Sequence, residues 1–125
     1  MHRRLTPIRL LAAVAACVLG VGIVTGLVHP PVREGEGAVV EYLAHLSMYF
    51  VFTVLVYLAT LSLKQSVPLA MVLGAVDELC QVLWPGACRP GLGDWLVDLA
   101  GIVIACMVIA RYRKQPPQRR MTWQT

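Results

Sequence analysis

Four long apolar runs divide this chain and limit what it can fold into. They cover residues 10–28, 38–63, 67–84 and 95–110. A helix that crosses a bilayer needs roughly 20 mostly apolar residues, and the first two runs meet that length easily. The last two runs are shorter and contain polar residues. We therefore predict an all-α integral membrane bundle of four transmembrane helices, forming a single domain over residues 1–125.

The composition argues against a soluble domain and against a disordered chain. Hydrophobic residues make up 58% of the sequence and charged residues 14%, whereas an average soluble domain is about half apolar and a quarter charged. The net charge is +4, but much of the basic charge lies at the two chain ends, where it flanks the apolar runs and argues against nucleic-acid binding. Cysteines 17, 80, 88 and 106 show no CxxC spacing, so we expect neither a zinc site nor a disulfide framework. A bridge between Cys80 and Cys88 near the outer face is conceivable, but we favour two unpaired cysteines, and we expect no cofactor.

Lysine and arginine counts predict a multi-pass protein of the plasma membrane with both termini in the cytoplasm. With four spans, the N-terminus, the second loop and the tail lie on one side, and the other two loops lie on the other. The second side carries only Arg33 and Arg89. Cytoplasmic segments are the ones enriched in basic residues. The nine residues of the first side are Arg3, Arg4, Arg9, Lys64, Arg111, Arg113, Lys114, Arg119 and Arg120.

The first apolar run has a second interpretation. Three arginines precede it, as in a signal peptide, and residues 14–17 (Val-Ala-Ala-Cys) are similar to a lipoprotein cleavage site. A signal peptide has an apolar stretch of about 7–15 residues. Here the apolar run continues well past Cys17, so we favour a membrane span.

Prolines and glycines mark the expected helix boundaries. His29-Pro30-Pro31 should end the first helix, because proline removes a backbone donor and restricts the residue before it. Pro68 should lie in the first turn of the third helix, where its missing N–H costs nothing. Trp84 and Trp95 should flank the outer loop as interfacial anchors.

Acidic residues lie only outside the predicted cytoplasmic segments, and several lie within spans. Ionised groups in hydrocarbon are costly, so such residues usually face the bundle interior and carry function. At about 1.5 Å per residue, His45 lies roughly 10 Å from the outer end of its helix, Asp77 roughly 12 Å and Asp98 roughly 6 Å. Three helices thus place polar groups at overlapping depths in the outer half of the membrane.

The polar residues of these helices recur at spacings of three or four residues, which places them on one face of each helix. We therefore predict one outward-opening polar cavity lined by the second, third and fourth helices. Gly101 and Ala105 share the face of Asp98, so a neighbouring helix should approach closely there. The candidate cavity residues are Glu41, His45, Tyr49, Asp77, Glu78, Gln81, Arg89, Asp94 and Asp98.

Several chemistries fit this set. Carboxylates with His45 could bind a divalent cation, act as general acid and base, or hold the cationic or hydroxylated part of a lipid headgroup. Arg89 could clamp a phosphate or neutralise Asp94. No metal site is established. The sequence contains no G-x-S-x-G and no HExxH motif, so it offers no catalytic nucleophile or triad.

The stretches "EYLAHLSMYFVF" and "DELCQVLWPGACRPGLGDWLVDLAG" resemble the VanZ-like membrane proteins, a family named for a teicoplanin-resistance accessory protein. The similarity runs from Glu41 to Gly101, with a VanZ-like core at about 38–111 and a basic tail at 112–125. His45 and Tyr49 match its first block. The second block, D-E-x-x-Q followed by P-G, is matched at residues 77–86. Asp94 and Gly101 match the third block, in which Asp98 stands where the family usually has Asn.

The resemblance implies a small multi-pass envelope protein that lowers susceptibility to glycopeptide antibiotics such as teicoplanin. In the first hypothesis the protein is not an enzyme and binds a membrane lipid or lipid-linked envelope precursor in its polar cavity. In the alternative it is a membrane enzyme that acts on a lipid or lipid-linked headgroup with acid/base or metal-ligating carboxylates. Ion transport is a weaker alternative, because four short spans offer no visible inward path.

Overall fold

Four helices account for nearly all of the chain that the structure describes. The structure is a computed structural model, and it describes residues 6–27, 38–83 and 92–114. Within these ranges there are no strands, and each helix is long and apolar enough to cross a membrane, which confirms the predicted all-α membrane bundle. The helices are α1 (Pro7–Val24), α2 (Ala38–Thr60), α3 (Leu63–Leu83) and α4 (Leu92–Lys114).

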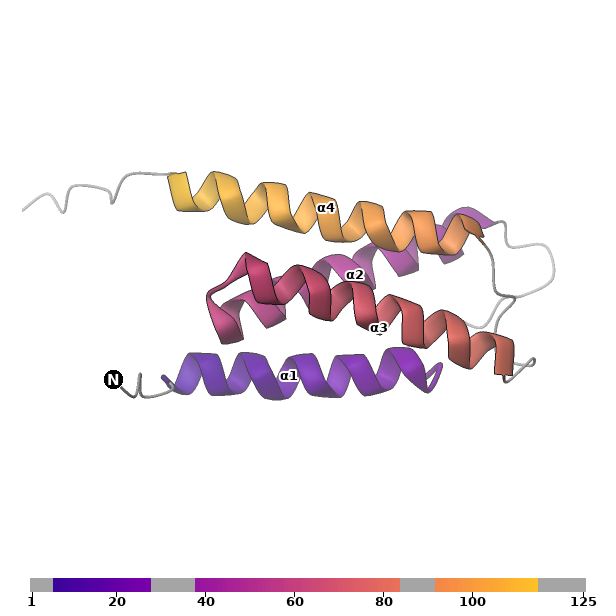
Figure 1. Cartoon of the computed structure of the whole chain (residues 1–125), viewed down its shortest axis with the longest axis horizontal. Coiled ribbons are helices and arrows are strands. Elements are labelled where there is room, and N and C mark those ends of the chain that lie inside the picture. The colour runs from indigo at the N-terminus through magenta and orange to yellow at the C-terminus, as the bar shows by residue number, and fades with distance from the viewer. Residues whose placement is uncertain (1–5, 28–37, 84–91, 115–125) are drawn as a thin grey trace, which may run out of the picture.

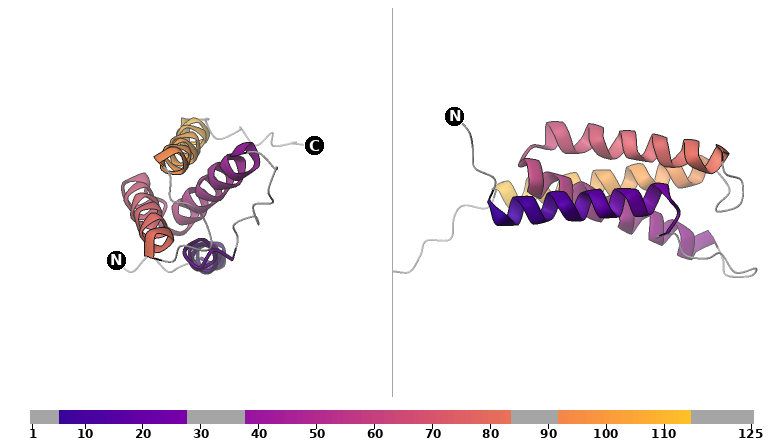
Figure 2. Two further views of the ribbon diagram at one scale, coloured as in Figure 1. Left: turned by 90° about the vertical axis from the view of Figure 1, so that its right-hand side faces the viewer. Right: turned by 90° about the horizontal axis from the view of Figure 1, so that it is seen from below.

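Helix α2 is the centre of the bundle. Consecutive helices run in opposite directions, so α1 and α3 begin at the end where α2 and α4 finish (Figure 1). Helix α2 packs against all three other helices, and most extensively against α4. The described parts of α1 and α4 do not contact each other, and they lie on different sides of the bundle when it is viewed along its axis (Figure 2). Residues on α2 can therefore reach partners on every other helix.

Two helix boundaries differ from the sequence prediction, the end of α1 and the start of α4. Helix α1 ends at Val24 although the apolar run continues, because Gly26 adopts a left-handed conformation with φ 72°. The Thr25 hydroxyl donates to the Val21 carbonyl oxygen at 2.7 Å. Helix α4 starts at Leu92, three residues before the predicted apolar run, so Asp98 lies about 9 Å from its start rather than about 6 Å.

Pro68 does not lie in the first turn of its helix, so that prediction is wrong. Helix α3 begins at Leu63, and Pro68 therefore falls in the second turn. There it cannot donate a hydrogen bond to the carbonyl of Lys64. The sequence prediction failed because the polar residues Lys64, Gln65 and Ser66 were assigned to a loop, whereas they form the first turn of the helix.

A two-residue turn joins α2 to α3, and a side chain of α1 forms a hydrogen bond to the end of α2 beside this turn. Leu61 adopts φ 56°, and the Thr60 hydroxyl receives a hydrogen bond from the Ser62 N–H at 3.3 Å. The Arg9 Nε of α1 donates to the carbonyl oxygen of Ala59 at 2.9 Å. A basic side chain on a terminal carbonyl is favourable because the C-terminus of a helix carries partial negative charge.

The distribution of polar and apolar side chains is the reverse of that in a water-soluble bundle. Large apolar side chains face outward; Leu11, for example, is 71% exposed. Polar side chains such as Thr53 and Ser66 are completely buried. In a lipid environment apolar side chains are well solvated outside the bundle, while polar groups need partners inside it. This arrangement supports a multi-pass membrane protein.

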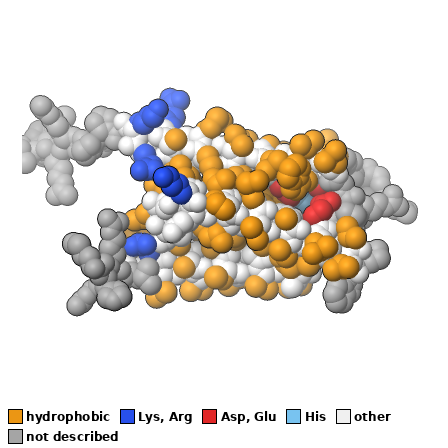
Figure 3. All heavy atoms as spheres, in the orientation of Figure 1, with side chains coloured by type: hydrophobic (Ala, Val, Ile, Leu, Met, Phe, Trp, Pro, Cys, Tyr) orange, Lys and Arg blue, Asp and Glu red, His pale blue; other side chains and the backbone are white. Residues whose placement is uncertain are grey.

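Charge is separated along the bundle axis. The Lys and Arg side chains of the described residues lie at the end where α1 and α3 begin, and the acidic side chains lie near the opposite end (Figure 3). We call the latter the acidic end. Its described carboxylates come from three helices: Glu41 on α2, Asp77 and Glu78 on α3, and Asp94 and Asp98 on α4.

Candidate functional site

A buried histidine–aspartate pair joins α2 to α4. The Nδ1 atom of His45 lies 3.0 Å from Oδ1 of Asp98, within hydrogen-bond and ion-pair distance. The two residues are 2% and 4% exposed. A buried carboxylate is stable only with a partner that donates hydrogen bonds, and His45 is such a partner. The pair fixes the register of α2 against α4.

A second buried pair joins α2 to α3 one helical turn away. The Tyr49 hydroxyl donates to Oδ2 of Asp77 at 3.2 Å. Tyr49 is fully buried and Asp77 is 2% exposed. Because His45 and Tyr49 are four residues apart on α2, the same helical face serves both acids. The structure thus brings together four of the predicted residues from three helices.

Each acid has a glycine one turn away on its helix, and at Gly101 the missing side chain lets α4 approach α2 closely. A Cβ atom at Gly101 would lie 2.5 Å from the Leu46 carbonyl oxygen, so α4 crosses the backbone of α2 where no side chain fits. Ala105, one turn further, is fully buried, as expected from the sequence. A Cβ atom at Gly74 would lie 3.5 Å from the Tyr49 ring, which is ordinary contact. Both glycines are three residues from the acid of their helix.

Two further predicted residues are buried beside these pairs. Gln81 is 5% exposed, and its Oε1 atom has no hydrogen-bond partner among the described residues. Asp94 is 7% exposed and lies in the first turn of α4. A carboxylate is favourable there because the backbone N–H groups of a helix N-terminus carry partial positive charge. The acidic end therefore holds more acceptors than the His45 and Tyr49 side chains satisfy.

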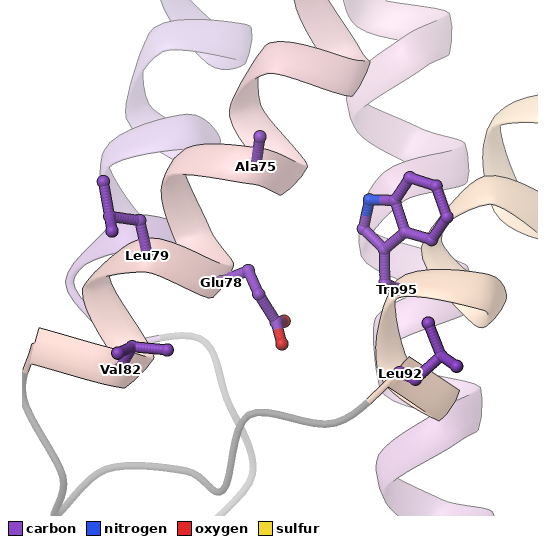
Figure 4. A pocket seen from close by; sticks show the side chains of 6 residues that line it. All are labelled: Ala75, Glu78, Leu79, Val82, Leu92 and Trp95. Carbon is purple, nitrogen blue, oxygen red and sulfur yellow. The ribbon is translucent and has the colours of Figure 1, made fainter.

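Glu41 and Glu78 are only half-buried and lie outside the two hydrogen-bonded pairs. Glu78 lines an open groove of about 540 Å³ between α3 and α4. Its carboxylate points into the space between the helices, and Trp95 of α4 forms part of the opposite wall (Figure 4). Arg89 lies outside the described residues, as does Cys88.

The structure places at the site two residues, Gly74 and Trp95, that the sequence analysis did not assign to it. Gly74 lies against the Tyr49 ring. The one feature of the sequence that could have indicated it is its spacing of three residues from Asp77, which equals the spacing between Asp98 and Gly101. Trp95 was predicted as an interfacial anchor, but it also lines the groove with Glu78. An aromatic residue near a membrane boundary gives no indication of which groove it will face.

Metal binding or nucleophilic chemistry would depend on which groups the geometry of the cluster brings together. Within the described residues, no group of three or more His, Cys, Asp or Glu side chains is placed so that it could hold a metal ion. Ser47, the hydroxyl nearest to His45 in sequence, is exposed and donates to the Leu43 carbonyl instead. What the arrangement offers is a buried hydrogen-bonded polar cluster beside an apolar groove with a carboxylate.

Taken together, the fold and this cluster define a small four-helix membrane protein with an acidic polar site at one end. No family model, no curated protein and no solved structure matches the chain.

Proposed function

We propose that this protein is a multi-pass protein of the plasma membrane that binds a lipid or lipid-linked envelope precursor at its acidic end. We further propose that it is VanZ-like and lowers susceptibility to glycopeptide antibiotics such as teicoplanin. The observation that carries the binding proposal is the pair of buried cross-helix contacts, His45–Asp98 and Tyr49–Asp77. Intramembrane ionisable groups are costly and are usually kept for function.

The test pairs a resistance measurement with a measurement of folded protein. Expression in a susceptible bacterium should raise the teicoplanin concentration needed to stop growth. Asp77→Asn should abolish this effect and leave the amount of folded protein unchanged, because the Asn oxygen still accepts from Tyr49 and no buried charge remains to be desolvated. Ser47→Ala is the matched control, since its hydroxyl is exposed on the same part of the bundle. Full resistance in Asp77→Asn would contradict the proposal.

A second candidate function is a membrane enzyme that acts on a lipid or lipid-linked headgroup. The observation that favours it is the Asp98 carboxylate at Nδ1 of His45, which would orient the imidazole for proton transfer. Purified protein would be assayed with polyprenyl-phosphate and phospholipid substrates, with and without Mg²⁺. Turnover that His45→Ala removes would favour this candidate, and lipid binding without turnover would favour the first.

A further inference from the structure

We propose that the groove between α3 and α4 binds a membrane lipid whose headgroup carries an ammonium group, with Glu78 and Trp95 as the recognising side chains. This inference rests on the proposed lipid-binding function and names the class of lipid.

The groove combines one charged residue with apolar walls. It is lined by Ala75, Glu78, Leu79 and Val82 of α3 and by Leu92 and Trp95 of α4 (Figure 4). Its volume of about 540 Å³ lies in the ordinary range for small-ligand sites. The occupant must therefore be amphipathic, with one group for the carboxylate and an apolar part for the walls.

Among the described residues, the Glu78 carboxylate lies near other acidic side chains. Glu78 makes no hydrogen bond or ion pair with the residues that the structure describes. Every described Lys and Arg lies at the opposite end of the bundle (Figure 3). Asp77 and Asp94 add negative charge to the same end. A cation would therefore be attracted to the described carboxylates at this end.

Trp95 suits an organic ammonium better than a metal ion or a hydroxyl group. The face of an indole ring attracts Lys, Arg and ligand ammonium groups, and quaternary ammonium ligands are often bound by aromatic side chains. Glu78 and Trp95 lie on opposite walls of the groove, and the nitrogen-bearing edge of the indole is turned toward α3 (Figure 4). This pairing favours phospholipids with ethanolamine or choline headgroups.

The groove opens among exposed apolar side chains, which favours a lipid over a water-soluble amine. Leu79 and Val82 are each 56% exposed, and Leu92 is 75% exposed. These residues belong to the outer surface of helices that are long and apolar enough to cross a membrane. A ligand would therefore enter sideways from the bilayer with its acyl chains against the apolar walls.

The depth of Glu78 is compatible with a headgroup contact. It precedes the last residue of α3, Leu83, by five residues, or roughly 7 Å. Its side chain extends toward α4 and toward the end of α3 (Figure 4). The polar headgroup layer adds about 5–8 Å to each side of the hydrocarbon core, so a headgroup lies within reach.

Brominated lipids can test the occupant directly, because bromine on an acyl chain quenches indole fluorescence on contact. The chain has three tryptophans; Trp84→Phe with Trp123→Phe leaves Trp95 as the reporter. This protein is reconstituted in phosphatidylglycerol vesicles that contain a minor fraction of brominated phosphatidylethanolamine, phosphatidylcholine or phosphatidylglycerol. We expect the ammonium lipids to quench Trp95 at about a tenfold lower fraction than brominated phosphatidylglycerol.

Substitutions separate headgroup recognition from mere contact with the bilayer. Glu78→Gln should remove the preference for ammonium lipids, and Glu78→Asp should keep most of it. Ala75→Phe should fill the groove and reduce quenching by all three lipids. Val76→Phe places the same side chain at the next position of α3, which does not line the groove, and should leave quenching unchanged.

Equal quenching by the three lipids, or an unchanged preference in Glu78→Gln, would overturn the inference. If the double tryptophan substitution prevents folding, the lipids that copurify with the native sequence and with Glu78→Gln are compared by mass spectrometry. The outcome is independent of the antibiotic test. Loss of resistance in Asp77→Asn together with no headgroup preference would leave the proposed function standing and remove only this inference.

Discussion

At the scale of single residues, Gly101 is the position where a small change should matter most. Gly101→Leu should lower the free energy of unfolding by about 1–3 kcal/mol, because even its Cβ would lie 2.5 Å from the Leu46 carbonyl oxygen. The measurement is thermal unfolding of the purified protein, together with its accumulation in the membrane.

Gly74→Ala is the matched control for this substitution. Gly74 is also buried and three residues from an acid, but its added Cβ would make only ordinary contact with Tyr49. It should unfold at nearly the native temperature. A Gly101→Leu protein as stable as Gly74→Ala would show that α4 does not cross α2 at this point.

The residues of the acidic end could be predicted from the sequence, but their pairing could not. Polar residues inside apolar runs stand out in a sequence because burying an ionisable group in a membrane costs free energy. For this reason the sequence predicts His45, Asp77 and Asp98 as site residues. Their partners depend on register. The start of α4 at Leu92 changed the distance of Asp98 from the helix start by about 3 Å, as much as the length of a hydrogen bond, and left its contact with His45 undetermined.

At the scale of helices, Pro68 weakens α3 and its replacement should strengthen it. Pro68 lies in the second turn and its ring is exposed, so Pro68→Ala restores a backbone donor and loses little packing. We expect the free energy of unfolding to rise by about 1–3 kcal/mol. Denaturant titration in mild detergent measures this change.

The neighbouring substitution Leu69→Ala controls for the loss of an exposed apolar side chain on the same turn. It should alter stability little. A decrease in stability for Pro68→Ala would mean that the proline is needed where it stands, for example to set the direction in which α3 leaves the turn.

The number and approximate positions of the helices could be predicted from the sequence, but the residues at which they begin and end could not. Apolar runs of the right length fix the number of spans because lipid requires every backbone group to be paired within the helix. The ends are set by local groups outside that pattern. Gly26 stops α1 within an apolar run, and the polar residues Lys64, Gln65 and Ser66 extend α3 before its apolar run begins.

At the scale of the whole molecule, the orientation in the membrane is the testable property. Basic residues predict that both termini are cytoplasmic. A reporter fused after Thr125 should therefore be active only if it is of a type that works in the cytoplasm. A fusion after Ser62, in the α2–α3 turn, should behave in the same way. Activity of an extracytoplasmic reporter at either site would show that the predicted orientation is wrong. The estimated depths of His45, Asp77 and Asp98 below the outer surface would then be wrong as well.

The separation of charge described above makes the bundle an electric dipole along its long axis. A membrane potential acts on such a dipole with about 2.3 kcal/mol per elementary charge moved across 100 mV. With the basic end inside, a potential that is negative inside stabilises the inserted orientation. An energised cell would then hold this protein more firmly in one orientation than a depolarised one, and would draw an ammonium group away from the acidic end toward the cytoplasm.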